Sequence, residues 1–232
     1  MLDNIVQQIS RMIVWEYKEL LLEGLWISIQ VTIISMIMAL IIGLLVAFLS
    51  INRNKFIRTF GFFYIELGRN TPILVTLLWF TYVLPPLINL RIESYWTAII
   101  ALVLQTSGYL AETFRSGIES VERGQRFASY ALGMNYIKTM QRIILPQAFR
   151  KSVPDVVNNF VVLFKTSTLV SIVAVPDLMY QASRLTAQLF KPVETYSSVA
   201  LAYIFIVFFL STGARKVQRV YQKRERAEAD YI

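Results

Sequence analysis

Residues 24–49 read GLWISIQVTIISMIMALIIGLLVAFL, an apolar run whose polar side chains are only Ser, Thr and Gln. A helix needs about 20 mostly apolar residues to cross the hydrocarbon core of a bilayer. This stretch is long enough and carries no charge. It therefore predicts a membrane-spanning helix, which sets the class of the whole protein.

The composition agrees with a membrane protein and excludes several kinds of chemistry. The 232 residues are 56% hydrophobic and 16% charged, whereas soluble domains carry about 25% charged residues. The chain has no Cys and no His, so it has no disulfide, no thiolate or imidazole metal site and no Ser-His-Asp triad. A phosphate-cradling loop ending in GKS or GKT is also missing from the sequence. We therefore predict a protein that is not an enzyme and holds no metal or cofactor.

Further apolar stretches follow the first one. They cover residues 71–84 (extended backwards by 60–67), 95–110, 156–175 and 196–210. Together with 24–49 they predict an all-α integral membrane protein with about five spanning helices. The second stretch is the most interrupted, because Glu66, Arg69 and Pro72 lie in or beside its first half.

Residues 1–23 predict a helix that lies at the membrane interface, with a poorly ordered leader as the alternative. Its apolar residues recur at helical spacing and precede two aromatic anchors: Ile5, Ile9, Met12, Ile13, Trp15 and Tyr17. We expect three segments in all: this helix, a transmembrane domain over 24–212 that includes a long loop at 114–153, and a basic tail over 213–232.

The distribution of basic residues predicts the orientation of the chain. Most of the 23 Lys and Arg lie after the first span, in the loop after the third span and in the tail. Cytoplasmic connections carry such an excess, so we expect the N-terminus outside and the C-terminus in the cytoplasm. Basic residues at the inner leaflet also neutralise anionic headgroups, which accounts for the net charge of +8 without nucleic acid.

The long loop over 114–153 predicts two short helices on the cytoplasmic side. The first covers 124–136, is rich in small residues and has a C-terminal stop at Gly133. One apolar stripe recurs at helical spacing: Phe127, Ala131 and Met134. The second covers 136–144 and is expected to end at Leu145-Pro146. Such an exposed helix suits a groove on another protein, although the loop could also fold back on the spans.

Two motifs in this loop resemble the signature loop of ATP-binding-cassette importer permeases. They are Gly124-Gln125 through Ala131-Leu132-Gly133, and Ile144-Leu145-Pro146-Gln147-Ala148. Further motifs resemble the polar amino acid branch of that family, which includes His, Glu, Gln and Arg permeases: Tyr109-Leu110-Ala111-Glu112, Arg69-Asn70-Thr71-Pro72 and Lys165-Thr166-Ser167-Thr168-Leu169. The chain departs from the family pattern at Asn70, Phe127, Ser129 and Thr166, which stand where the family carries Gly, an acidic residue, Ala and Asp or Asn.

The resemblance implies a type I importer permease fold in a bacterial cell (inner) membrane. It implies a translocation path for a polar amino acid, with separate ABC ATPase subunits, a second permease subunit and an extracytoplasmic solute-binding protein as partners. The residues implied to couple to the ATPase are Gly124, Gln125, Phe127, Ala128, Ala131, Leu132, Gly133, Leu145 and Pro146.

Polar residues at membrane depth mark a candidate substrate path. They are Lys165, Thr166, Ser167, Thr168, Thr71, Pro72 and Glu112. A lysine at this depth costs about 3 kcal/mol on insertion scales, so we expect it either to face a water-filled path and bind an anionic substrate group, or to pair with Glu112 or Glu66. The three hydroxyls could bind substrate or join helices. Pro72 is expected to break its helix, and Glu112 to pair with Arg115 three residues on.

Two alternatives remain open at this point. One is a permease of the same superfamily for another small solute, such as a sugar, a metal or a peptide. The other is a secondary transporter or a channel that works without ATP, although that class normally shows an internal repeat or more spans.

Overall fold

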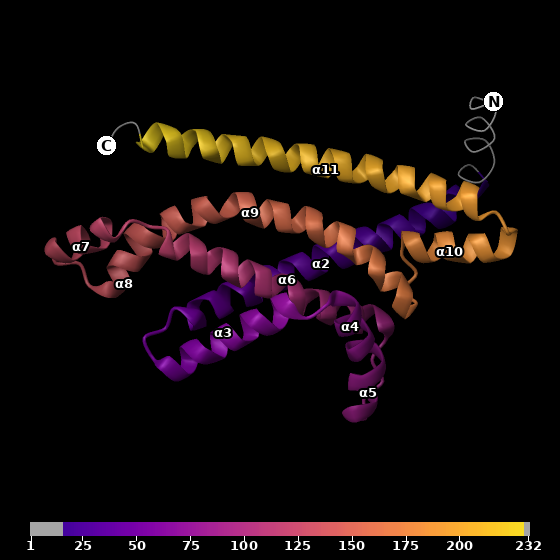
Figure 1. The fold of residues 1–232 in the computed structure, drawn as a ribbon, viewed down its shortest axis with the longest axis horizontal. Coiled ribbons are helices and arrows are strands. Elements are labelled where there is room, and N and C mark those ends of the chain that lie inside the picture. The colour runs from indigo at the N-terminus through magenta and orange to yellow at the C-terminus, as the bar shows by residue number, and fades with distance from the viewer. Residues whose placement is uncertain (1–15, 230–232) are drawn as a thin grey trace. The chain divides into compact units, whose positions relative to one another are not determined.

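The computed structural model describes residues 16–229, which contain helices and no strand (Figure 1). The elements are α2 (Lys18–Ser50), α3 (Lys55–Asn70), α4 (Ile73–Leu78), η1 (Trp79–Val83), α5 (Leu84–Leu87), α6 (Ser94–Glu119), α7 (Arg123–Ala131), α8 (Tyr136–Thr139), η2 (Met140–Ile144), α9 (Leu145–Thr166), η3 (Ser167–Val173), α10 (Leu178–Leu189) and α11 (Pro192–Ala229). The all-α prediction is confirmed for this part of the chain.

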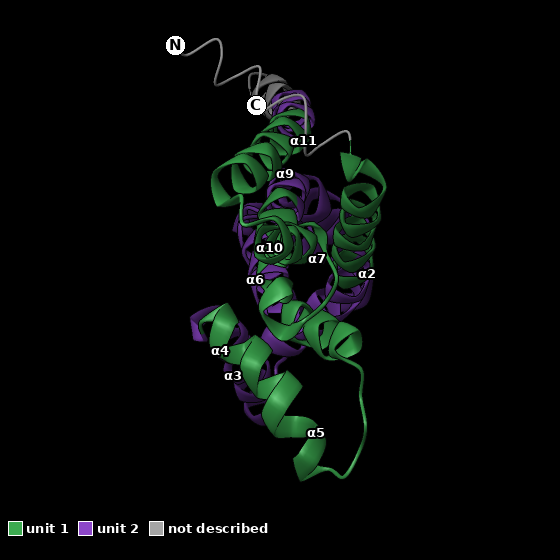
Figure 2. Cartoon of the chain, turned by 90° about the vertical axis from the view of Figure 1, so that its right-hand side faces the viewer, with its two compact units in different colours: residues 1–36, 72–103, 161–211 green, residues 37–71, 104–160, 212–232 purple. Residues whose placement is uncertain are grey.

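The described residues divide into two compact units (Figure 2). Among the described residues, unit 1 comprises 16–36, 72–103 and 161–211, and unit 2 comprises 37–71, 104–160 and 212–229. The long helices α2, α6, α9 and α11 each contribute one segment to each unit.

Unit 1 has an apolar cluster formed by α2, α10 and α11. Its buried members are Leu178, Ala182 and Val199, and Leu21, Leu25 and Tyr203 pack against them. Asp177 begins α10, because its side chain accepts a hydrogen bond from the backbone N–H of Tyr180 at 2.9 Å. Such an N-cap satisfies one of the amides that a helix start leaves unpaired.

Unit 2 contains two apolar clusters, and a close crossing of α3 and α6. The first cluster is Ile118, Val121, Met140, Ile144 and Ala148, and the second is Val46, Ile65 and Ala111. The crossing depends on glycine, because a Cβ built on Gly68 would lie 2.6 Å from the carbonyl oxygen of Leu104 and 3.2 Å from the Cα of Gly108. Small residues let helix backbones approach this closely.

Three helices are long and apolar enough to cross a membrane, and a bent pair raises the number to four within the described residues. The three are Lys18–Ser50, Tyr136–Val173 and Pro192–Tyr221, and the pair is Lys55–Asn70 with Ile73–Leu87. The helix α6 covers the stretch predicted as the third span. Its apolar run is interrupted by Gln105, Thr106 and Ser107, and α6 is not among the helices that are long and apolar enough to cross a membrane. The count of five spans therefore stays a prediction.

The helices at both ends extend beyond the predicted spans, and the predicted segment boundaries stay predictions. Residues 1–15 of the expected interfacial helix lie outside the described residues, and α2 already begins at Lys18 rather than at residue 24. Glu19 lies in the first turn of α2, where the helix dipole favours an acidic side chain. At the other end α11 continues to Ala229, because Lys, Arg, Glu and Gln are good helix formers. The basic stretch from residue 213 is thus the continuation of a helix in the described part.

The long loop is more helical than predicted, and its second helix does not end at Pro146. The helix α6 runs to Glu119, and a single helical run extends from Tyr136 to Val173. The π turn η2 makes this possible, because the N–H of Leu145 bonds to the carbonyl of Met140 five residues earlier. Pro146 then lies in the first turn of α9, where a residue without an N–H is tolerated.

Candidate coupling surface and substrate path

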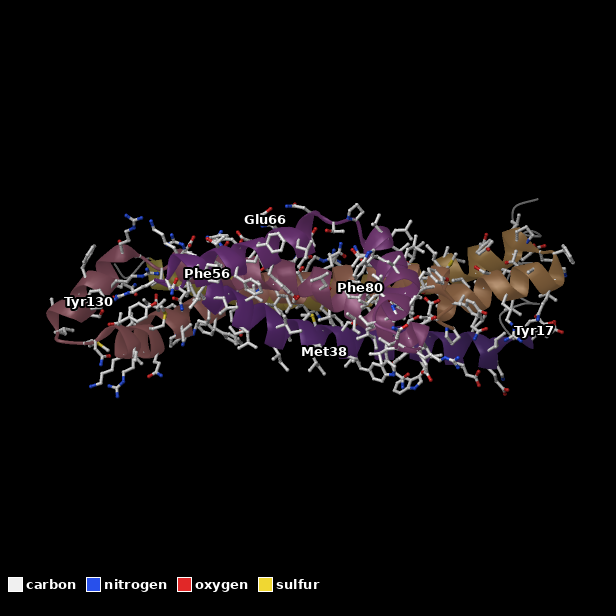
Figure 3. The ribbon with its side chains drawn as sticks, turned by 90° about the horizontal axis from the view of Figure 1, so that it is seen from below. Tyr17, Met38, Phe56, Glu66, Phe80 and Tyr130 are labelled. Carbon is white, nitrogen blue, oxygen red and sulfur yellow. The ribbon has the colours of Figure 1, made fainter. Side chains whose placement is uncertain are left out.

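The first candidate site is an exposed surface on α7 and the turn that follows it, which we call the coupling surface and define as Phe127, Ala128, Ala131 and Leu132. Phe127 is 70% exposed and Leu132 is 81% exposed. Figure 1 shows α7 and α8 next to each other at the left of the picture, and Tyr130 of α7 is labelled in Figure 3. Exposed patches of large apolar side chains are typical of surfaces that bind another protein.

Gly133 ends α7 as the sequence predicts. Its φ of +76° is left-handed, a conformation that glycine adopts without steric cost. The N–H of Gly133 donates to the carbonyl of Tyr130 at 2.9 Å, and the N–H of Met134 donates to the carbonyl of Ser129 at 3.0 Å. The helix therefore stops at Ala131, and the prediction that Met134 belongs to its apolar stripe is wrong.

Buried polar and apolar contacts hold α7 on the rest of unit 2. The hydroxyls of Ser129 and Thr139 are 2.9 Å apart and buried, so they join α7 to α8. Arg126 donates from Nη2 to the carbonyl of Ile118 at 2.9 Å, which ties α7 to the end of α6. These hydrogen bonds attach α7, which carries the coupling surface, to α8 and to the end of α6.

The remaining predicted coupling residues lie outside the coupling surface, and Gln125 and Leu145 are partly buried. Gln125 accepts a hydrogen bond from Gln147 of α9, and Leu145 packs against the buried cluster of Ile118 and Met140. Gly124 and Pro146 are exposed. Since all nine predicted residues belong to unit 2, the structure brings them into one compact region.

Sequence reasoning missed two exposed apolar residues beside this surface and the hydroxyl pair beneath it. Tyr130 and Ile137 are exposed, Ile137 at 62%. Their positions could have been found from the helical stripe, because Tyr130 lies three residues after Phe127. The pairing of Ser129 with Thr139 has no sequence signal, since it depends on how the turn at Gly133 folds α8 back against α7.

A second group of charged residues links α3 to α6 in unit 2. Arg115 pairs with Glu112 at 2.6 Å and with Glu119 at 2.7 Å, and Arg69 lies 3.9 Å from Glu112. The guanidinium of Arg69 also lies over the ring of Tyr109, whose hydroxyl donates to the carbonyl of Arg69 at 3.3 Å. The predicted pair of Glu112 and Arg115 is present, and a cation from α3 extends it into a network.

The helix break predicted at Pro72 is also present. The helix α3 ends at Asn70 and α4 begins at Ile73, so Thr71 and Pro72 lie outside both helices. At the break, the carbonyl of Thr71 accepts a hydrogen bond from the amide Nε2 of Gln105 at 3.4 Å. Asn70 donates to Glu66, which projects from α3 in Figure 3. The backbone freed by the proline is therefore partly satisfied by side chains, as a broken helix in a membrane requires.

Lys165 lies at the point where α9 changes to the 3-10 helix η3. Its side chain is exposed, and it forms no ion pair among the described residues. Glu112 is paired with Arg115 and Arg69 instead. Lys165 belongs to unit 1, whereas Glu112 and Glu66 belong to unit 2, so both interpretations of this lysine stay predictions.

The three hydroxyls after Lys165 differ in what they contact. Ser167 is fully buried and accepts a hydrogen bond from the hydroxyl of Thr32 at 3.3 Å, which joins η3 to α2. Thr166 and Thr168 donate to the carbonyls of Val162 and Lys165. Pro72 and Lys165 through Thr168 belong to unit 1, whereas Thr71 and Glu112 belong to unit 2.

The chain resembles known transport proteins along most of its length. It matches the family described as binding-protein-dependent transport system inner membrane component over residues 39–227. It is 32% identical over 199 residues to the arginine transport system permease protein ArtQ of Bacillus subtilis (strain 168), which covers 86% of this chain and 91% of that protein. It is 30% identical over 207 residues to the glutamine transport system permease protein GlnP of Escherichia coli (strain K12), which covers 89% and 94%.

Solved structures give the same result for the fold. The crystal structure of an amino acid ABC transporter with histidines superposes with a TM-score of 0.84 at 30% identity, over 89% of this chain and 96% of that one. The MetNI methionine ABC transporter superposes with a TM-score of 0.75 at 18% identity, over 89% and 98%, which concerns the fold alone. The fold is thus that of type I ABC importer permeases. The chain belongs to the binding-protein-dependent transport system inner membrane component family, and it is a protein of the bacterial cell membrane.

Proposed function

We propose that this chain is the permease subunit of an ATP-binding-cassette importer and forms a translocation path for a polar amino acid. The observation that carries the proposal is the coupling surface, because an exposed apolar helix that is hydrogen-bonded to its neighbours is what a separate motor protein needs to push on. Two relatives are named as an arginine and a glutamine transport system permease protein, and these names support the substrate class.

Force applied to the coupling surface has a route along the chain. The run from Tyr136 to Val173 is helical without interruption, and Thr139 in its first turns is bonded to Ser129 of α7. A displacement of α7 by an ATPase would therefore move the run that carries Lys165. Alternation between outward-open and inward-open states by this kind of rigid-body motion is a general transport mechanism.

Lys165 is the residue proposed to bind the substrate. Its ammonium group is exposed and has no carboxylate partner in the described part of the chain. A cation without a partner at membrane depth is costly unless water or a ligand solvates it. The α-carboxylate that every amino acid carries would supply the missing partner.

The remaining partners follow from the same proposal. Two permease subunits would enclose the path, with the N-terminus outside and the coupling surface in the cytoplasm. A solute-binding protein would deliver the amino acid from outside, and ATP hydrolysis would occur in the partner ATPase. The permease itself would perform translocation and no catalysis.

Co-purification with the ATPase tests the coupling surface. We expect the wild type to form a stable complex whose ATP hydrolysis is stimulated by substrate, and Gly133→Asp to lose both, because a Cβ at φ +76° strains the turn that ends α7. Asn135→Asp is the matched control: it adds the same charge two residues on, and Asp caps the start of α8 as well as Asn does. Uptake that persists without any ATPase would contradict the proposal and favour a secondary transporter or channel.

A transport assay in proteoliposomes tests Lys165. We expect Lys165→Ala to reduce uptake of acidic, basic and amide amino acids alike by at least about tenfold, the value of one charge-assisted hydrogen bond. Lys191→Ala removes an exposed lysine of the same unit and should leave uptake unchanged. Loss of acidic substrates alone would place the ammonium group against a side chain, and unchanged uptake would remove Lys165 from the path.

A further inference from the structure

A cavity lies in unit 2, where α7 meets α3 and α6. It has a volume of about 530 Å³ and is lined by the end of α2 and by residues of α3, α6, α7, α8 and η2. Its apolar walls include Ile51, Phe62 and Ile118, and its polar lining includes Arg58 and Arg126. The cavity thus combines a mostly polar lining, including two guanidinium groups, with a few apolar walls.

The positive charge of this cavity is not balanced by carboxylates. Neither Arg58 nor Arg126 forms an ion pair with any described residue. Glu119 also lines the cavity, but its Oε2 accepts a hydrogen bond from Nη1 of Arg115 at 2.7 Å. Arg126 uses Nη2 for the carbonyl of Ile118, and its Nε is buried without an acceptor.

Other groups around the cavity also suit an anion. Tyr136 lines it with a hydroxyl, which can donate to a phosphate oxygen. The guanidinium of Arg53 lies 4.9 Å from the centre of the Tyr136 ring, so a third cation lies directly beside the lining. Arginine is the side chain best matched to phosphate, because its planar fork donates two parallel hydrogen bonds.

An exposed apolar stripe on α2 runs toward this cavity. Leu44 and Phe48 are exposed and lie on the same helix face as Ile51, at spacings of four and three residues. The backbone N–H of Ile51 still bonds to the carbonyl of Ala47, so this face continues past the last residue of α2. An acyl chain lying along the stripe would therefore bring its headgroup to Arg58 and Arg126.

We infer that this cavity binds the phosphate headgroup of an anionic phospholipid from the cytoplasmic leaflet. The inference rests on the proposed function for its orientation, since the coupling surface must face the cytoplasm. The bound headgroup would connect α3, through Arg58, with α7, through Arg126. It would thereby hold the coupling surface in place and make ATPase coupling depend on anionic lipid.

Native mass spectrometry of the full-length chain tests the inference. The protein is purified in detergent and titrated with phosphatidylglycerol or with zwitterionic phosphatidylcholine. We expect the wild type to retain phosphatidylglycerol in preference to phosphatidylcholine. We expect Arg58→Gln to retain phosphatidylglycerol about tenfold more weakly than the wild type does. Lys55→Gln removes the same charge from the same helix outside the cavity and should bind as the wild type does. Arg126→Gln serves as a second variant and should weaken retention similarly.

Three outcomes overturn the inference. The first is equal retention of both lipids, and the second is equal loss of lipid in Arg58→Gln and Lys55→Gln. The third is a thermal shift in lipid-free micelles that is as large with inorganic phosphate alone as with phosphatidylglycerol. This third result would indicate that the site binds a soluble anion. The measurement of retained lipid needs neither transport nor ATP hydrolysis. Failure of the importer assignment would therefore leave the lipid result readable, and failure of lipid binding would leave the importer assignment intact.

Discussion

Asp177 is a buried carboxyl group whose pKa departs from its ordinary value. Its side chain has no exposed surface, and it lies between the helical run that ends at Val173 and the span that begins at Pro192. One carboxylate oxygen caps α10 through Tyr180, and Oδ2 is buried without a partner. Burial raises the pKa of Asp177 to about 7, although the backbone hydrogen bond from Tyr180 acts in the opposite direction.

This raised pKa predicts a pH-dependent stability. In the unfolded chain an Asp loses its proton near pH 4, whereas the folded protein keeps it to about pH 7. Between these values the folded state holds more protons, so stability falls as the pH rises from about 4 to about 7 and then levels off. Asp177→Asn keeps the cap and should remove this slope. Melting temperatures in detergent between pH 5 and pH 8 measure it, and equal slopes in both proteins would contradict the prediction.

At the scale of elements, the crossing of α3 and α6 depends on the absence of side chains. A Cβ on Gly68 would lie 2.6 Å from the backbone oxygen of Leu104, which cannot move independently of α6. We expect Gly68→Ala to lower the free energy of unfolding by about 1–3 kcal/mol, the usual cost of overpacking. Thermal unfolding in detergent measures this change.

The control for this substitution is Gly213→Ala. Gly213 lies within α11 and has nothing within 4 Å of its missing Cβ. The same methyl group there should be neutral or slightly stabilising, because alanine is the better helix former. If both variants unfold at the temperature of the wild type, the close approach of the two helices is not what stabilises unit 2.

The sequence predicts some of the interruptions of the helices and not others. The break at Pro72 follows from the proline itself, since it cannot continue a helix without loss of a hydrogen bond. Pro146 carries the same signal, yet the chain passes it within one helical run. The difference is the π turn of η2, which changes the hydrogen-bond register just before the proline. No local sequence pattern predicts that π turn.

At the scale of the whole molecule, the coupling surface is expected to contribute to assembly and not to folding. Leu132 is 81% exposed, so Leu132→Ser removes little buried area from the permease. A leucine buried in an interface contributes about 1.5–3 kcal/mol, and we therefore expect roughly tenfold or greater loss of ATPase affinity with no change in melting temperature. Titration of the purified ATPase in nanodiscs measures the affinity.

Phe149→Ser is the matched control. Phe149 is also a large exposed apolar residue of unit 2, but it lies on α9 and outside the coupling surface. Its substitution should leave the affinity for the ATPase unchanged. Equal losses in the two variants would mean that the ATPase does not read the coupling surface, and equal affinities in all three proteins would place the contact elsewhere.

The sequence by itself determined the membrane class, the helical fold and the family, since each depends on local signals: apolar length, helix breakers and short motifs in order. It also determined the stop at Gly133 and the pairing of Glu112 with Arg115, because these groups are near neighbours along the chain. Only the tertiary structure decided that Ser129 bonds to Thr139, that Gly68 touches α6, and that Arg58 and Arg126 line one cavity. These contacts join residues from different helices, and their geometry depends on how the helices pack, which no local pattern encodes.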